Sequence, residues 1–276
     1  MLGTSVRFAE RTLAQRLTSS VDHVETVRWV RHWTEGYFSF AITRPQSFRF
    51  RSGEFVMIGL PINGKPVMRA YSIASPAWAD ELEFFSIKAP GGLLTTELQL
   101  IQPGDQILLG KKPTGTLVLD TLRPGRNLFL LGTGTGLAPW LSIIRDPATY
   151  ERFERVFVAH GVRMTKDLAY RDLLEHGLEE DEFLGDFVRD GLSYYPCVTR
   201  EPFVHQGRLT ELIADGSLFR DLDLPGASFD AAEDRVMLCG SMGMIRDVAA
   251  MLEAGGLREG SNADPADFVI ERAFVG

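Results

Sequence analysis

Short apolar runs separated by turn-forming residues fill the first half of this chain. Phe38, Phe40 and Ile42 alternate with small or polar neighbours, which is typical of a strand with one buried face. Runs rich in β-branched and aromatic residues lie at residues 21–33, 37–43, 54–60, 67–73, 82–88 and 106–110. Glycine, proline and asparagine break them at hairpin spacing, and this favours an antiparallel barrel or a sandwich. One helical pattern, at residues 93–101, interrupts the strands.

Strand and helix patterns alternate from residue 127 to the end. Strands are predicted at residues 127–131, 155–160, 193–199, 235–239 and 267–274, and helices at 138–145, 168–176, 209–214 and 242–253. Repeated βα units of this kind predict a parallel sheet with helices on both faces. Ligands of such sheets bind at the carboxyl ends of the strands, so candidate site residues are expected there.

The first strand of this second half leads into a glycine-rich loop, Gly132-Thr133-Gly134-Thr135-Gly136. Glycine lets the backbone approach a ligand closely, and the helix that follows offers unpaired N–H groups and a partial positive charge to a phosphate. The spacing departs from the G-x-G-x-x-G dinucleotide fingerprint. We therefore expect either a nucleotide pyrophosphate at this loop or a tight turn without a ligand.

The two halves carry net charges of opposite sign, although the whole chain is at −8. Residues 1–126 hold fifteen Lys/Arg and eleven Asp/Glu, which gives +4, whereas residues 127–276 hold fourteen and twenty-six, which gives −12. With Pro124-Gly125 at the change, we expect one domain over residues 1–125 and a second over 126–276. The positive first domain indicates an acidic partner, unless the asymmetry has no functional meaning.

Composition and spacing also disfavour several classes of protein. The first twenty residues have no apolar run, so neither a secretory signal nor a membrane span is expected, and the cytoplasm is the default location. Cys197 and Cys239 stand far apart and the five histidines form no cluster, which argues against a metal or iron–sulfur site. We expect no metal ligand, and neither nucleic acid nor a membrane as a partner.

Two stretches of the first half carry candidate chemistry. Arg69-Ala70-Tyr71-Ser72 combines a forked donor for phosphate, a ring that can stack on a flat heterocycle and a hydroxyl that can bond a ring heteroatom. The same residues would also suit a solvated strand edge with a core tyrosine. In residues 86–95, loop amides and Thr95 offer a second place for a phosphate.

The predicted strand ends of the second half bring three arginines together. Arg163 and Arg200 follow successive strands and Arg208 comes shortly after, an arrangement that suits a phosphomonoester. The alternative is that these arginines pair with the many carboxylates of this half. Cys239 precedes Gly240 at another strand end, where it is either a pocket residue or a small buried hydrophobe.

The order of these motifs resembles that of the bacterial ferredoxin(flavodoxin)–NADP reductases. The resemblance is carried by residues 69–72, 132–139, 160–163, 199–202, 239–242 and 273–275, and it extends from about Val21 to the C-terminus. It implies a two-domain protein, with a six-stranded antiparallel β-barrel that binds FAD followed by an α/β domain with a parallel sheet that binds NADP. It also implies a C-terminal tail that returns to the flavin.

The resemblance assigns the barrel residues to FAD. Arg69, with Ala70, would hold the pyrophosphate, while Tyr71 would stack on the isoalloxazine and Ser72 would bond near its reactive nitrogen. The flavin phosphate and ribose would be held by Ile87, Lys88, Gly92, Leu93, Leu94 and Thr95. Ala273 stands where plant-type relatives place an aromatic residue over the flavin, and Phe274 would pack against the folded FAD.

The remaining matches fall on the NADP side. Thr135, with Gly134 and Gly136, would lie between the two cofactors, and Cys239 would line the nicotinamide pocket beside Gly240 and Met242. The adenosine 2′-phosphate would be surrounded by Arg163, Thr199, Arg200 and Arg208. On this resemblance Tyr71, Ser72, Cys239 and Ala273 contact the reacting rings, and no general acid or base is required.

The expected activity is that of a ferredoxin/flavodoxin–NADP reductase, which exchanges hydride with NADP(H) and single electrons with a small acidic carrier protein, as a monomer. Lys65, Lys88, Lys111 and Lys112 are the candidate contacts with that carrier. Two alternatives stay open: the reductase component of an oxygenase system, and a flavin-binding sensor module without turnover. An attached iron–sulfur domain would bring a cysteine-rich stretch that this chain lacks, so a separate carrier is favoured.

Overall fold

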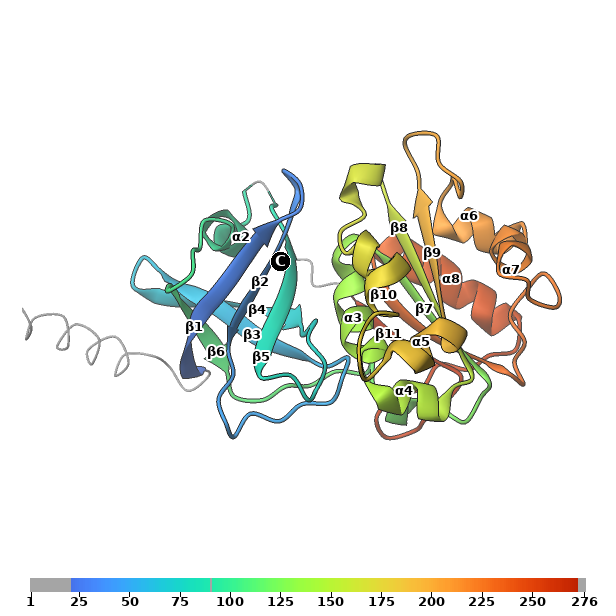
Figure 1. Ribbon diagram of the computed structural model, residues 1–276, viewed down its shortest axis with the longest axis horizontal. Helices are drawn as coiled ribbons and strands as arrows, with labels where there is room; N and C mark the ends of the chain where they lie inside the picture. The colour runs from blue at the N-terminus through green and yellow to red at the C-terminus, as the bar shows by residue number, and fades with distance from the viewer. Residues whose placement is uncertain (1–20, 90, 273–276) are drawn as a thin grey trace, which may run out of the picture.

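The computed structural model describes residues 21–89 and 91–272, and in this part of the chain two sheets with separate cores lie side by side (Figure 1). The first sheet comprises β1 (Val21–His32), β2 (Tyr37–Thr43), β3 (Phe55–Ile62), β4 (Lys65–Ser72), β5 (Glu81–Ile87) and β6 (Gln106–Gly110). A short helix, α2 (Leu93–Leu98), lies between β5 and β6. The helical pattern extended to residue 101, so this helix ends earlier than predicted.

The first sheet curls into a barrel. Its strands are antiparallel in the order β4-β3-β6-β1-β2-β5, and a bridge between Ile73 and Phe84 brings the two edge strands together. Phe40 pairs with Phe84 across β2 and β5, and the two rings lie 5.4 Å apart inside the barrel. The alternation of apolar residues therefore predicted the strands correctly, and closure is achieved by the aromatic side chains that face inward.

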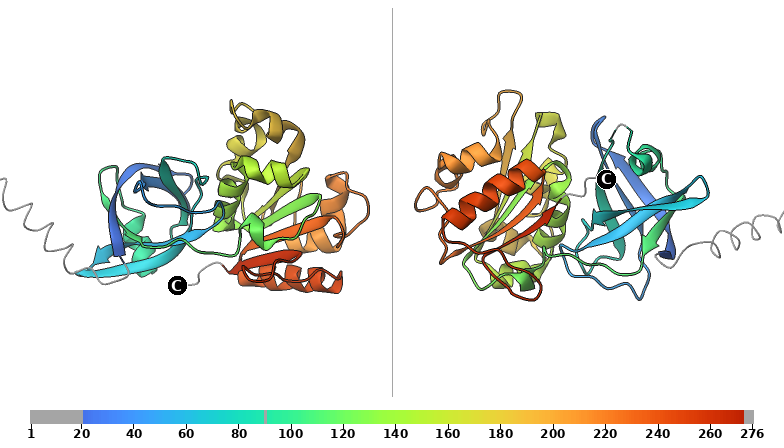
Figure 2. Two further views of the ribbon diagram at one scale, coloured as in Figure 1. Left: turned by 90° about the horizontal axis from the view of Figure 1, so that it is seen from below. Right: turned by 180° about the vertical axis from the view of Figure 1, so that it is seen from behind.

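The second sheet is parallel, in the order β11-β10-β7-β8-β9. Its strands are β7 (Asn127–Thr133), β8 (Arg155–Val162), β9 (Leu192–Val198), β10 (Asp234–Gly240) and β11 (Phe268–Arg272). One face of the sheet is covered by α3 (Ala138–Ile144), α4 (Pro147–Arg152) and α5 (Gly185–Gly191). The other face is covered by α6 (Leu209–Ala214), α7 (Ser217–Asp221) and α8 (Met242–Ala254) (Figure 2). Both faces of the strands are buried, as near-continuous apolar runs require.

Two predictions for the second half need correction or fall outside the described residues. The helix predicted at 168–176 begins only at residue 171 and continues as a π-helical turn at Leu173–Gly177. A 3₁₀ turn at Thr165–Asp167 precedes it, and Tyr170 between them takes a left-handed φ of 61°, which no helix allows. The last strand is described only to Arg272, so Ala273 and Phe274 lie outside the described residues. Helices α4, α5 and α7, each five to seven residues long, were not predicted.

Helix α3 forms much of the contact between the barrel and the parallel sheet (Figure 1). The Ser142 hydroxyl donates to the carbonyl of Ser75 at 2.7 Å and accepts from the amide of Gly53 at 3.2 Å. These buried polar groups are satisfied across the junction, which fixes the position of α3 on the barrel.

Within residues 21–89 and 91–272, no helix combines the length and the apolar character that a bilayer crossing needs.

Candidate active site at the junction of the two sheets

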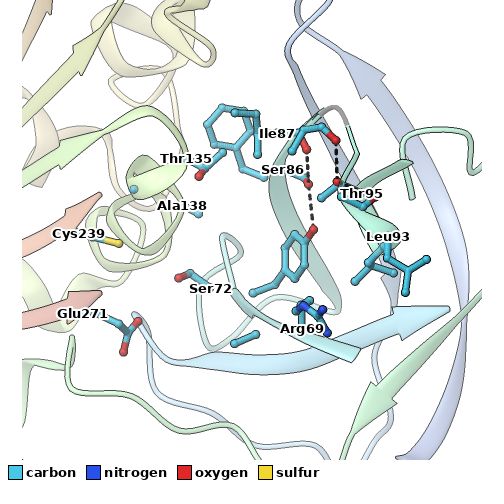
Figure 3. A pocket seen from close by; sticks show the side chains of 17 residues that line it. Arg69, Ser72, Ser86, Ile87, Leu93, Thr95, Thr135, Ala138, Cys239 and Glu271 are labelled. Atoms are coloured by element: carbon cyan, nitrogen blue, oxygen red, sulfur yellow. Dashed lines mark hydrogen bonds between the residues drawn. The ribbon is translucent and has the colours of Figure 1, made fainter. Parts of the chain in front are cut away.

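A cavity of about 210 Å³ lies where the barrel meets the parallel sheet (Figure 3). The barrel contributes residues from β4, β5 and α2, and the opposite wall comes from the glycine loop and the ends of β10 and β11. It is lined by Arg69, Ala70, Tyr71, Ser72, Phe85, Ser86, Ile87, Ala89, Gly92, Leu93, Leu94, Thr95, Thr135, Gly136, Ala138, Cys239 and Glu271. Residues predicted from four separate motifs thus share one cavity.

Tyr71, on β4, lines this cavity. Its hydroxyl lies 3.2 Å from that of Ser86, and its ring packs edge-on against Phe84 at 6.4 Å. Burial raises the pKa of the Tyr71 hydroxyl, partly offset by the Ser86 hydrogen bond, so the phenol stays neutral at physiological pH. A flat ring held by two neighbours is a preorganised surface on which a planar ligand can stack.

Polar groups flank the ring on both sides. Arg69 precedes Ala70 on β4, and its side chain is exposed. Its guanidinium donates to the carbonyl of Met68 at 2.9 Å. On the other side the Thr95 hydroxyl bonds the carbonyls of Ala89 and Gly92 at 3.2 and 3.4 Å, which orders the loop before α2. The cavity therefore has a cation at its edge and backbone groups of a tight loop within reach.

The glycine loop approaches the end of β10 too closely for any side chain. A Cβ at Gly136 would lie 2.2 Å from the carbonyl oxygen of Cys239. Gly240 has a φ of 146°, and a Cβ there would lie 2.3 Å from Oγ1 of Thr133. These positions require glycine for close backbone packing, which brings Thr135 and Cys239 to the same cavity wall.

Glu271 was not recognised in the sequence as a site residue. Its carboxyl is buried in the cavity wall, Oε1 accepts from the amide of Thr116 at 3.3 Å, and Oε2 has no partner among the described residues. Burial, with the nearby Glu54, raises the pKa of Glu271 to about 8. Burial and the Glu271 charge also raise the pKa of the Cys239 thiol, which therefore remains protonated.

A second cavity, of about 930 Å³, opens at the carboxyl ends of the parallel strands. Its lining residues are Tyr37, Ile87, Thr133, Gly134, Thr135, Gly161, Val162, Arg163, Thr199, Arg200, Gly207, Arg208, Leu209, Thr210, Glu211, Gly240, Ser241, Gly243, Met244 and Asp247. Thr135 and Ile87 line both cavities, so the two open beside each other. The volume falls in the range of small-molecule and cofactor sites.

The three predicted arginines meet in this second cavity. The amide of Arg200 donates to the carbonyl of Arg163 at 3.0 Å, which holds these two residues together. Arg208 lines the same cavity from the start of α6, where its amide donates to Glu211 at 3.0 Å. All three side chains are exposed. Within the described part of the chain, none of their guanidinium groups forms a salt bridge with a carboxylate. They are available to an anionic ligand.

A few predicted residues lie outside both cavities. Lys88 does not line either one, and its ammonium donates to the carbonyl of Thr34 at 3.1 Å. Met242, the first residue of α8, is also absent from both linings and is 45% exposed.

Among residues 21–89 and 91–272, no three His, Cys, Asp or Glu side chains are grouped as a metal ion would require.

Comparison with known proteins assigns both halves of the chain. Residues 28–118 match the oxidoreductase FAD-binding domain, and residues 130–250 match the oxidoreductase NAD-binding domain. The first match falls on the barrel, and the second falls on the parallel sheet apart from β11 and the start of β7.

Relatives match over nearly the whole chain. Ferredoxin–NADP reductase A of Sorangium cellulosum is 55% identical over 91% of this chain and 90% of its own length. The flavodoxin/ferredoxin–NADP reductase of Rhodobacter capsulatus is 54% identical over 91% and 93%. The structure of a ferredoxin NADP+ reductase from Neisseria gonorrhoeae with bound FAD and NADP superposes with a TM-score of 0.82, at 31% identity, over 91% of this chain and 98% of that one.

Proposed function

The chain belongs to the ferredoxin(flavodoxin)–NADP reductases, and we propose that its first cavity takes the flavin of FAD while its second takes NADP(H). The activity is that of an FAD-dependent oxidoreductase that exchanges hydride with NADP(H) and electrons with ferredoxin or flavodoxin. Bound FAD supplies the conversion between a two-electron hydride and the single electrons of an iron–sulfur carrier. The observation that carries the proposal is that Thr135 lines both cavities, so ligands of the two would meet there.

The residues of the first cavity fit a flavin. The Tyr71 ring lines the space on one side, and on the other side Gly136 packs directly against the Cys239 carbonyl, so that loop backbone forms part of the wall. Oε2 of Glu271 is buried at the cavity wall without a partner among the described residues, as expected of a polar group that a ligand completes. A buried unpartnered atom and a stacking surface, opposite a wall of loop backbone, together match a planar, polar ring.

On this proposal the barrel residues bind and orient FAD. Tyr71 stacks on the flavin, Ser72 bonds a ring heteroatom, and Arg69, beside Ala70, holds the pyrophosphate. The loop and first turn of α2 bind phosphate and ribose through Ile87, Gly92, Leu93, Leu94 and Thr95. Lys88, Ala273 and Phe274 keep the roles that the family resemblance predicts for them, and these roles stay predictions.

The opposite wall controls the region where the two rings meet. Gly134, Thr135 and Gly136 bring the loop backbone to the junction, and Cys239 supplies a neutral, apolar thiol. Since Oε1 of Glu271 accepts from Thr116, its proton is held at Oε2, where a neutral carboxyl can donate a hydrogen bond into the cavity. The enclosing residues exclude water from the site of hydride exchange.

The arginines of the second cavity read the adenosine 2′-phosphate. Arg163, Arg200 and Arg208, with the Thr199 hydroxyl, converge on one region that suits a dianion. Gly240 lines the same cavity, while Met242 at the start of α8 stays a predicted contact. We infer a preference for NADPH over NADH, because only NADPH carries that phosphate.

The electron carrier docks on the barrel. The excess positive charge of residues 1–126 supports an acidic ferredoxin or flavodoxin as the partner. The monomeric state and the cytoplasmic location stay predictions from the sequence.

An anaerobic titration tests the proposed function. The purified protein should contain one FAD per chain, identified after release, and NADPH should bleach its visible absorbance. Addition of oxidised ferredoxin or flavodoxin should restore the oxidised spectrum. Absence of flavin, or a flavin that NADPH leaves oxidised, would refute the proposal and favour a binding module without turnover.

A further inference from the structure

Tyr170 belongs to the α/β half of the chain but is buried against the barrel. It follows the 3₁₀ turn after β8, and its ring packs against Trp33 at 4.5 Å and edge-on against Phe85 at 5.5 Å. Both of those residues come from the first 126 residues of the chain. Phe85 also lines the FAD cavity, so Tyr170 touches the back of a cavity wall without entering the cavity.

The backbone at Tyr170 adopts a conformation that its residue type disfavours. Its φ of 61° lies in the left-handed region, which is strained for a bulky side chain. Such a conformation persists only where surrounding contacts over-determine it, and it recurs at functional positions. The contacts that hold this one are therefore informative.

The Tyr170 hydroxyl joins a directed chain of hydrogen bonds between the two halves. It lies 2.8 Å from Oε1 of Glu83 and 2.5 Å from the hydroxyl of Ser39. A phenol has one proton, and a carboxylate can only accept, so Tyr170 donates to Glu83 and Ser39 donates to Tyr170. The indole of Trp33 then donates to Ser39 at 2.7 Å, which completes the chain.

Glu83 is held from the same side by a second group of the α/β half. Arg145, which follows the last residue of α3, donates to Oε2 of Glu83 at 2.8 Å and to the carbonyl of Ala74 at 2.5 Å. Glu83 is only 8% exposed, so its carboxylate oxygens are stabilised by Tyr170 and Arg145 in place of water. One buried carboxylate on β5 thus receives a phenol and a guanidinium from the opposite half.

The elements joined by this network are the ones that carry the cavity walls. Strand β5 bears Glu83 and, two residues on along the same face, Phe85. Helix α3 begins at Ala138 directly after the glycine loop and ends beside Arg145. A displacement at Glu83 would therefore move one cavity wall relative to the other.

We propose that Tyr170 is a positioning residue, which through Glu83 and Arg145 sets the separation between the FAD cavity and the NADP(H) cavity. The inference rests on the proposed occupants of the two cavities. Tyr170 touches neither cavity directly, so its removal changes the alignment of the bound rings and leaves their contacts intact. Misplacement of reacting groups by about 1 Å lowers a rate roughly 100-fold.

The test compares Tyr170→Phe with Tyr150→Phe. The Tyr150 hydroxyl donates to the carbonyl of Ile144 at 2.8 Å and is also largely buried, but this bond lies within the α/β half. In stopped-flow experiments at saturating NADPH, Tyr170→Phe should lower the limiting rate of flavin reduction about 10- to 100-fold, with an unchanged apparent Kd for NADPH. Tyr150→Phe should keep that rate within about twofold of the parent.

Hydrogen–deuterium exchange gives a readout that does not depend on turnover. Tyr170→Phe should speed exchange in β5 and α3, the elements that the network joins, whereas Tyr150→Phe should not speed it in β5. Glu83→Gln, which keeps an acceptor for Tyr170 but loses the charge, should give the same pattern if Tyr170→Phe fails to fold.

Two results would overturn the inference. One is an unchanged limiting rate in both Tyr170→Phe and Glu83→Gln. The other is a lower rate with unaltered exchange in β5 and α3. If instead NADPH does not reduce the flavin of the parent protein, the proposed function fails, while the exchange experiment still reports whether the network couples the two halves.

Discussion

Nε2 of His160 lies 3.0 Å from the carbonyl oxygen of Gly134 in the loop between the two cavities. A carbonyl can only accept, so Nε2 carries the proton and Nδ1 is free to accept from the hydroxyl of Tyr194, 3.4 Å away. The ring is fully buried near the end of β8, and its hydrogen bond holds the loop at the Gly134 carbonyl. Burial lowers the pKa of His160 to about 4, so the imidazole is neutral throughout the physiological range.

This buried histidine should make the protein sensitive to acid. Its pKa is lower in the folded state than the unfolded value of about 6.5, so the stabilisation is complete above that value and is lost as pH falls toward about 4. The loss should be on the order of 3 kcal/mol. Urea unfolding of the parent and of His160→Gln across this pH range measures it. A glutamine variant with the same acid dependence as the parent would contradict the prediction.

Glu271 should give the opposite pH dependence. Its pKa is raised from about 4.5 to about 8, so the folded state retains a proton that the unfolded state loses. Its contribution is therefore most favourable below pH 4.5 and declines as pH rises to about 8, by up to about 5 kcal/mol. Glu271→Gln keeps an acceptor for Thr116 and cannot ionise, so unfolding midpoints of the variant should fall less with rising pH. Parallel profiles for the two proteins would show that Glu271 does not titrate in this way.

The coenzyme preference should depend on the arginine cluster. A charge-assisted contact contributes about 1.5–3 kcal/mol, so Arg200→Ala and Arg208→Ala should each raise KM for NADPH roughly 10- to 150-fold. Neither kcat nor the kinetics with NADH should change much, since the phosphate is bound alike in ground and transition states and NADH lacks it. Arg189→Ala, which removes an exposed arginine paired with Asp186 at 2.9 Å, is the matched control. Equal losses with both coenzymes would mean that the arginines support the fold instead.

Carrier docking should depend on lysines near the flavin end of the barrel. Lys88 follows Ile87 of the FAD cavity, and Lys111 and Lys112 follow β6. Reversal of these charges to glutamate should slow reduction of ferredoxin or flavodoxin in a salt-dependent manner, while NADPH-dependent reduction of ferricyanide is spared. Lys65, the fourth candidate, lies at the opposite end of β4 from Ser72, so its reversal should slow the carrier least. Carrier rates that respond neither to salt nor to these reversals would contradict docking here.

Regular periodicity made most of the fold predictable. The alternation around Phe38, Phe40 and Ile42 and the apolar runs of the parallel strands dictate which faces are buried, and the structure has the strands within a few residues of their predicted limits. The predicted start of the helix at residue 168 was wrong, because a tertiary network holds Tyr170 in a left-handed conformation that no local pattern signals.

The site was predictable where chemistry sits in a motif or at a strand end. Arg69, Tyr71 and the three arginines were candidates by residue type and position, and the structure places Arg69 and Tyr71 on the first cavity and the three arginines on the second. Glu271 and Tyr37 were missed because they lie in strands, where a single charged residue or tyrosine resembles an ordinary member of the core. The lone carboxylate in the apolar run of β11 was the available signal for Glu271.

The central claim is that ligands of the two cavities meet at Thr135, so that hydride passes directly between them. Anaerobic stopped-flow mixing of the FAD-loaded protein with NADPH, and with NADPH carrying deuterium at the transferred position, tests it most directly. We predict that flavin absorbance is lost within a single turnover and that deuterium slows this loss. A flavin that stays oxidised, or a bleaching rate indifferent to deuterium when reduction limits the observed phase, would contradict the account.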